Sequence, residues 1–433
     1  MARKQQELAW VAAGQALTLG IGFLSIKILT GMMGVAAYGQ LMLGVSIAAL
    51  ISLFIYGPLG QAATRFYSVC RARGDLGGYI QAFRTIHTRL LKALMLPAFA
   101  VAAASSLVIE GIWPYLVAAA ILYAAVSGIN HGFISMFGGM RRRAVVAVHQ
   151  AAESAARLSG AVLMMLLAGI SPAAALVGYG AGSLLVLGSL SRVAGTSNGL
   201  VHVQQLPPPA SGNANTEEQA LYEEIRRYVL PFLVWAAIGY AFLHGDRWML
   251  QGVRGPEAVG AYVAIYQIGS ALPNALIAII SQYLEPLVFE RFEAADNAER
   301  QRDGMALIRK ATLYIGLFLT LIVSLAATWS AEITGFVTTP EFTRHAGLLA
   351  WIVAATGLIG LGQILTIQGL AMRRPSAYIG PKAVAAGVLL GAAFFGATQR
   401  GAEGVAMALT AAGTVYLVSV LAVNTRLSRY EPS

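Results

Sequence analysis

Long apolar runs separated by short polar segments follow one another along the whole chain. An α-helix rises 1.5 Å per residue, so about 20 apolar residues cross the hydrocarbon core of a bilayer. Twelve runs are long enough, in two sets of six. They lie at about 9–30, 41–66, 93–109, 112–138, 154–170 and 172–191, and then at about 228–250, 259–287, 311–329, 346–371, 379–397 and 404–424. The pattern predicts an all-α integral membrane protein with about 12 transmembrane helices.

The polar segments between the runs alternate sharply in charge. Those on one side, Arg141–Arg143 and Arg157 among them, hold 24 of the 30 lysines and arginines. The opposite segments hold only Arg254, Arg344 and Arg400. Because Lys and Arg gather in cytoplasmic loops, we expect both termini to be cytoplasmic.

Composition narrows the class of protein further. The chain is 57% hydrophobic and 12% charged, whereas a soluble domain is about 25% charged. The net charge of +10 lies in short loops between spans, which argues against a nucleic-acid partner. Cys70 is the only cysteine, so neither an internal disulfide nor a cysteine-built metal site is expected. With no GxxxxGK[ST] loop and no paired metal ligands, we expect no cofactor, no metal site and no catalytic residue.

A polar segment divides the two sets of spans. Residues 192–224 contain the stretch QLPPPASGNANTEEQ, which is rich in Pro, Gly and Asn and shows no apolar period. We interpret it as a flexible cytoplasmic linker. The predicted domains are therefore an N-terminal six-helix lobe at 1–192, a linker at 193–224 and a C-terminal six-helix lobe at 225–433. Residues 75–94 are predicted to form either an amphipathic helix on the inner membrane surface or an extension of the third span.

A short turn sequence occurs once in each half. GVAAYGQL begins at Gly34 and GPEAVGAY begins at Gly255, an offset of 221 residues (255 − 34). At the same offset Gly39 matches Gly260, and each copy links the first and second spans of its half. Six is an even number of spans, so both halves enter the membrane in the same orientation, as parallel repeats. The glycines allow a tight turn where φ is positive or a side chain would clash.

Two parallel six-helix bundles joined by a linker indicate a two-lobed transporter with substrate bound in a central cleft. The stretches IKILTGMMGVAAYGQLMLGVSIAALISL and RWMLQGVRGPEAVGAYVAIYQI resemble polysaccharide and O-antigen flippases of the multidrug/oligosaccharidyl-lipid/polysaccharide exporter superfamily. The resemblance implies a bacterial inner-membrane protein. It would move an undecaprenyl-diphosphate-linked oligosaccharide outward for exopolysaccharide or O-antigen biosynthesis, beside a polymerase and a chain-length regulator.

Ionisable side chains inside the runs are candidates for substrate contact. Lys27 lies late in the first run, and Asp246 and Arg247 lie late in the seventh, so each repeat carries a cation at nearly the same depth. Such groups cost about 2.5–3.5 kcal/mol on insertion scales and usually face an interior or a cavity. The cations either line the cleft and attract a diphosphate or acidic sugar, or reach the outer interface. Asp246 either joins this site or pairs with Arg247.

Two amides and a histidine complete the candidates. Gln61 and Gln282 match across the repeats, and amides of this kind either bind sugar hydroxyls or join helices. His244 precedes Arg247 by three residues and so shares its helical face. Two other functions stay open: a multidrug cation antiporter of the same superfamily, which would need carboxylates near mid-span, and a non-transporting scaffold of a polysaccharide-synthesis complex.

Overall fold

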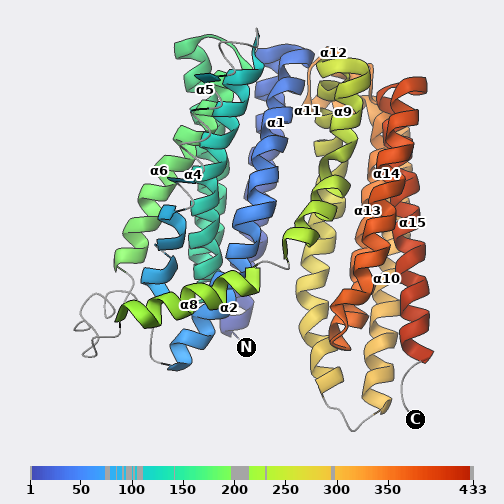
Figure 1. The fold of residues 1–433 in the computed structure, drawn as a ribbon. Coiled ribbons are helices and arrows are strands. Elements are labelled where there is room, and N and C mark those ends of the chain that lie inside the picture. Colours follow the sequence, from blue (N-terminus) through green and yellow to red (C-terminus); the bar gives the residue numbers. More distant parts are fainter. Residues whose placement is uncertain are drawn as a thin grey trace. The chain divides into compact units, whose positions relative to one another are not determined.

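The computed structural model describes residues 2–73, 79–83, 85–89, 92, 93, 100, 103, 104, 111–140, 142–196, 214–229, 232–293 and 298–429 (Figure 1). Within these ranges every regular element is a helix. The first half contains α1 (Ala2–Ile51), the π-helix η1 (Ser52–Tyr56), α2 (Gly57–Arg73), α4 (Trp113–Gly139), α5 (Arg143–Ala168), α6 (Pro172–Thr196) and α8 (Ala214–Val229). The second half contains α9 (Phe232–Glu293), α10 (Ala298–Thr328), α11 (Ser330–Val337), α12 (Pro340–Thr343), α13 (Leu348–Ala371), the 3₁₀-helix η2 (Pro375–Tyr378), α14 (Ile379–Arg400) and α15 (Ala402–Arg429).

The helices account for the apolar runs of the sequence. In the described part of the chain, nine are long and apolar enough to cross a membrane. Two of these, Ala12–Tyr67 and Phe232–Phe292, each cover two predicted spans because the helix continues through a kink. Eleven predicted spans therefore fall on helices, and the predicted span at 93–109 lies mostly outside the described residues. The all-α membrane fold is confirmed.

Contacts between residues divide the chain into two compact units. Unit 1 comprises Met1–Ser25 and Leu41–Ala237, and unit 2 comprises Ile26–Gln40 and Ile238–Ser433. The part of α1 on both sides of Gly34 thus packs with the second half of the chain. The predicted lobes at 1–192 and 225–433 stay a prediction, and the linker predicted between them at 193–224 is taken up below.

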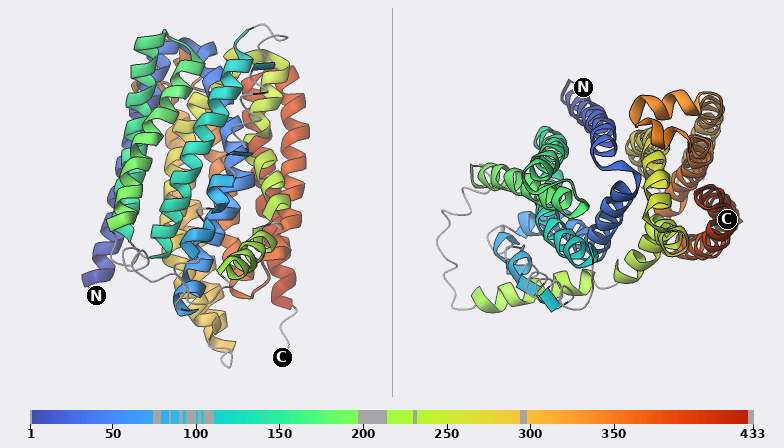
Figure 2. Two further views of the ribbon diagram at one scale, coloured as in Figure 1. Left: turned by 60° about the vertical axis from the view of Figure 1, so that its left-hand side comes forward. Right: turned by 90° about the horizontal axis from the view of Figure 1, so that it is seen from above.

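Each unit is a bundle of antiparallel helices. In unit 1, α6 packs on both α4 and α5, and α4 packs on α2. The three helices α4, α5 and α6 run side by side in Figures 1 and 2. In unit 2, α13 packs on α10 and α15, and α15 packs on α14. Close packing of this kind uses small residues: a Cβ on Gly178 of α6 would overlap the Gly160 carbonyl of α5, as expected for helices packed within a membrane.

The repeated turn has the same geometry in both copies. Gly34 has φ 70° and ψ 177°, and Gly255 has φ 79° and ψ −175°. A positive φ of this size is strained for residues with a Cβ. The predicted need for glycine at these two positions is confirmed, and it explains how α1 and α9 each bend without ending.

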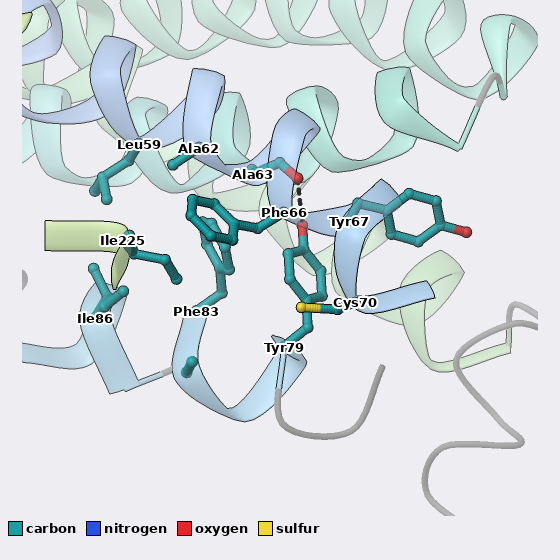
Figure 3. Packing of buried hydrophobic residues seen from close by; sticks show 11 residues of the cluster. Leu59, Ala62, Ala63, Phe66, Tyr67, Cys70, Tyr79, Phe83, Ile86 and Ile225 are labelled. Atoms are coloured by element: carbon teal, nitrogen blue, oxygen red, sulfur yellow. Dashed lines mark hydrogen bonds between the residues drawn. The ribbon is translucent and has the colours of Figure 1, made fainter. Parts of the chain in front are cut away.

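The prediction that residues 192–224 form a flexible linker is wrong for its C-terminal part. The structure places residues 214–229 in helix α8, while residues 197–213 lie outside the described residues. Ile225 is 1% exposed and packs with Leu59 of α2. It also packs with Phe83 and Ile86, which lie in the helical residues 79–83 and 85–89 (Figure 3). Apolar side chains at positions 222, 225 and 229 have helical spacing, and this period was missed because it continues past the segment's predicted end.

The described part of residues 75–94 is helical at 79–83 and 85–89. Its buried side chains pack on α2, and the Tyr79 hydroxyl donates a 2.8 Å hydrogen bond to the Ala63 carbonyl (Figure 3). Burial raises the pKa of the Tyr79 phenol, so it stays a hydrogen-bond donor at neutral pH. The amphipathic face of this segment therefore meets protein.

Candidate functional site

Asp246 lies in the first limb of α9 and is 1% exposed. Its Oδ2 accepts a 2.5 Å hydrogen bond from the Tyr262 hydroxyl, and its Oδ1 accepts a 2.8 Å hydrogen bond from the backbone N–H of Arg247. Tyr262 lies beyond the kink at Gly255, in the second limb of the same helix. A buried carboxylate requires such partners. The Asp246–Tyr262 bond therefore ties the two limbs of α9 together.

The Arg247 guanidinium points to other groups. It is 8% exposed, its Cζ lies 5.0 Å from the centre of the Tyr266 ring, and its Nη1 lies 3.3 Å from His244 Nδ1. The shared helical face predicted for His244 and Arg247 is confirmed. Within the described part of the chain, the buried Nε–H of Arg247 has no hydrogen-bond partner. Arg247 therefore keeps donor capacity that Asp246 and His244 do not use.

Aromatic rings hold His244 in place. Tyr240 stacks on the His244 ring at a centroid distance of 5.1 Å, and the Trp248 indole N–H donates a 2.8 Å hydrogen bond to the Tyr240 hydroxyl. Tyr262 and Tyr266 lie 6.0 Å apart on the other limb. A cation over a ring face gains about 0.5–2 kcal/mol, so the Tyr266 ring helps to hold the Arg247 guanidinium in place.

Lys27 has different partners from Arg247. Its Nζ donates a 2.6 Å hydrogen bond to the Phe336 carbonyl near the end of α11, and it lies 5.2 Å from the centre of the Phe336 ring. The side chain is exposed. The last carbonyl groups of a helix have no hydrogen-bond partner within that helix, and a lysine side chain often supplies one. Lys27 does this for the Phe336 carbonyl. The structure therefore gives Lys27 a structural contact and leaves part of its side chain accessible.

Gln61 and Gln282 are both exposed, on α2 and α9 respectively. Their matched positions in the repeats thus have matched exposure. Neither amide is buried between helices of its own unit, so helix joining within a unit does not explain them.

A second polar cluster lies in unit 1 and was missed in the sequence. Arg157 Nη1 donates a 2.7 Å hydrogen bond to the Tyr123 hydroxyl, and the Tyr123 and Tyr179 rings meet edge to face at 5.6 Å. Glu153, one turn before Arg157, accepts a 3.1 Å hydrogen bond from Ser183. These residues come from α4, α5 and α6. Glu153 and Arg157, four residues apart at the start of the apolar run at 154–170, were the available signal.

The assignment of Arg157 to a charged loop is wrong. Helix α5 begins at Arg143, so Arg157 lies near the middle of a 26-residue apolar helix. The fifth span starts earlier than its apolar run, because the alanines, valines and glutamine after Arg143 continue the helix. Arg141 lies outside the described residues. Among the residues that the structure describes, no cluster of His, Cys, Asp or Glu is arranged to hold a metal ion.

Comparison with known proteins identifies a matching protein family. Residues 5–292 match the family described as polysaccharide biosynthesis protein. Curated proteins give no match.

Three solved structures illustrate the fold. A transporter of the MOP superfamily from Pyrococcus furiosus, described as having a binding pocket of reversed polarity, is 13% identical with a TM-score of 0.67, covering 99% of this chain and 96% of that one. The inward closed lipid II flippase MurJ is 10% identical with a TM-score of 0.64, covering 98% and 93%. An inward-facing multidrug resistance MATE transporter is 12% identical with a TM-score of 0.62, covering 98% and 95%. At these identities the likeness shows the shared fold.

Proposed function

We propose that this chain, which belongs to the polysaccharide biosynthesis protein family, is a flippase for a lipid-linked oligosaccharide. It would move an undecaprenyl-diphosphate-linked repeat unit from the cytoplasmic to the periplasmic leaflet by alternating access, for exopolysaccharide or O-antigen biosynthesis. The proteins that share its fold are membrane transporters and flippases, not enzymes. Family and fold support a MOP-superfamily transporter, and the substrate and direction are our proposal.

The observation that carries the proposal is the buried Arg247 guanidinium. Its acidic neighbour Asp246 is held by Tyr262 and by a backbone N–H, and the Arg247 Nε–H has no partner among the described residues. A guanidinium is always charged and binds phosphate and carboxylate oxygens through a planar fork. An anionic group of the substrate would supply the missing acceptor.

The other candidate residues enter this proposal with distinct roles. Lys27, Gln61 and Gln282 are exposed, so they can meet a substrate without rearrangement of their own helices. Lys27 would attract the diphosphate, and the two glutamines would bind sugar hydroxyls. Asp246 would act as a positioning residue that fixes the limb carrying Arg247.

The multidrug cation antiporter is less well supported. An organic cation would need a carboxylate that faces it, yet Asp246 is bonded to Tyr262 and Glu153 accepts a hydrogen bond from Ser183. Both acids therefore already accept hydrogen bonds from side chains of their own helix bundles. A non-transporting scaffold would not depend on Arg247 at all, and this difference separates it from a flippase.

The proposed setting follows from charge and family. We place the chain in the bacterial inner membrane with both termini cytoplasmic, because the lysines and arginines gather on that side. A polysaccharide polymerase and a chain-length regulator would consume the translocated repeat units.

Deletion and complementation test this function. Deleting the gene should abolish surface glycan and cause lipid-linked repeat units to accumulate on the cytoplasmic side. Arg247→Ala should restore surface glycan far less well than the unmodified gene at equal membrane levels, whereas Arg400→Ala, which removes an exposed cation, should restore it fully. A deletion strain with normal surface glycan would contradict the flippase function, and full restoration by Arg247→Ala would favour the scaffold.

A further inference from the structure

A cavity in unit 1 shares no lining residue with the polar clusters described above. It has a volume of about 360 Å³ and lies where α8 meets η1, α2 and the helical residues 85–89. Its wall is apolar and includes Phe54, Ile55, Leu59, Ile225 and Val229. The side chains of Arg89 and Arg226 complete the lining.

Tyr222, which also lines the cavity, lies beside both arginines. Arg89 Cζ lies 5.2 Å from the centre of the Tyr222 ring. Tyr222 and Arg226 are one helical turn apart on α8, so their side chains are neighbours on its surface. The Tyr222 ring therefore brings Arg89, from one segment, close to Arg226 from another.

Arg226 also forms an exposed ion pair on its own helix. Arg226 Nη1 lies 3.1 Å from Glu223 Oε1, and the two side chains are 59% and 45% exposed. An exposed ion pair of this kind contributes only about 0–1 kcal/mol. The Arg226 guanidinium can therefore turn toward a stronger anion at little cost.

The apolar wall has an unusual backbone on one side. Phe54 and Ile55 belong to η1, a five-residue π-helix between α1 and α2. Such wide turns are rare and often occur at functional sites. Here the π-helix presents Phe54 and Ile55 to the same cavity that the arginines border. The cavity thus combines an apolar wall with a cationic edge.

We propose that this cavity binds an anionic phospholipid of the adjacent leaflet. Its phosphate would lie between Arg89 and Arg226, and an acyl chain would lie along Phe54, Ile55 and Leu59. Two guanidinium groups favour an anionic headgroup over a zwitterionic one, because a headgroup amine would meet two like charges. Basic pockets between helices on the positively charged side of membrane proteins bind lipid headgroups in this way.

A lipid in this place would fasten α8 to the rest of unit 1. Arg226 belongs to α8, and Arg89 belongs to the segment that packs on α2, so one phosphate would join two elements. The site does not depend on the transported substrate, and the proposal therefore stands independently of the flippase function.

Thermal unfolding of the purified full-length protein tests the proposal. Phosphatidylglycerol added to the detergent should raise the unfolding midpoint by about 4 °C, as a ligand well above its Kd does, and phosphatidylethanolamine with the same chains should not. The double variant Arg89→Gln/Arg226→Gln should lose this shift. Arg227→Gln removes an exposed charge from the same helix without touching the cavity lining, and it should keep the shift.

Three results would overturn the assignment. The first is an equal shift with phosphatidylethanolamine, and the second is an undiminished phosphatidylglycerol shift in the double variant. The third is displacement of bound phosphatidylglycerol by equimolar farnesyl diphosphate, which would make the site one for prenyl diphosphates. If the double variant is unstable, native mass spectrometry of Arg89→Lys/Arg226→Lys decides: this variant should retain co-purified phosphatidylglycerol, and its absence would refute binding by these cations.

Discussion

Gly39 and Gly260 occupy equivalent positions in the two sequence repeats, and each lies against the backbone of the other repeat. A Cβ on Gly39 would overlap the carbonyl oxygen of Pro256, and a Cβ on Gly260 would overlap the carbonyl oxygen of Val35. Val35 and Pro256 are themselves separated by the repeat offset of 221 residues. The contact is therefore reciprocal, as a two-fold relation between the repeated turns requires.

Alanine at Gly39 should destabilise unit 2. The added methyl group meets backbone atoms that cannot rotate away, and overpacking of this kind costs about 1–3 kcal/mol. We expect Gly39→Ala to lower the thermal unfolding midpoint by several degrees. Gly252→Ala is the matched control, because a Cβ there meets open space, and an equal midpoint for both variants would refute the close contact.

Tyr262→Phe should destabilise the protein by removing the hydrogen bond to Asp246 Oδ2. Hydrogen bonds to charged groups are worth about 1.5–3 kcal/mol, and the carboxylate would stay buried. Tyr283→Phe, on the same helix with an exposed ring, should have no measurable effect on the unfolding midpoint. The double variant Asp246→Asn/Tyr262→Phe should lose less than the sum of the two single changes; strict additivity would show that the two side chains do not interact.

Helix α8 should matter for stability, whereas the segment before it should not. Ile225→Ala removes a buried side chain from the cluster in Figure 3 and should cost about 2–3 kcal/mol. Shortening 199–209 should leave both the unfolding midpoint and transport intact, because residues 192–212 lack an apolar period. An inactive but stable deletion would show that this segment contributes to function.

The charge pattern predicts the orientation of the chain. Alkaline phosphatase fused after residues 85, 210 or 300 should be inactive, because these positions fall on the side rich in Lys and Arg. Fusions after residues 36, 256 or 342 should be active. Activity at residue 210 would contradict cytoplasmic placement of both termini.

Periodicity and charge were enough to predict most of this fold. The apolar runs predicted the helices, because a segment in lipid must satisfy its own backbone hydrogen bonds. The repeated glycines gave the two kinks, because only glycine readily adopts the φ found at Gly34 and Gly255. Helix α8 was missed because its apolar spacing begins inside a polar segment. The helix is stabilised by packing on α2, which the sequence does not show.

The polar clusters were only partly predictable. Asp246, Arg247 and His244 could be recognised as in-span ionisable groups on one stretch of helix. Their tyrosine partners could not, because Tyr262 and Tyr266 meet them only after α9 bends at Gly255. Arg157 was misplaced because helix α5 begins at Arg143, well before the apolar run. Its hydrogen bond to Tyr123 depends on helix packing, which spacing along one chain does not show.

The most direct test is transport by the purified protein in liposomes. Liposomes would carry a labelled undecaprenyl-diphosphate-linked oligosaccharide in both leaflets, and a glycan-cleaving enzyme outside would report how much reaches the outer leaflet. We predict that the protein brings nearly all of the labelled glycan within reach of the enzyme, and that Arg247→Ala slows this at least tenfold while Arg400→Ala does not. Cleavage that stops at the outer-leaflet fraction, as in protein-free liposomes, would contradict the proposed flippase function.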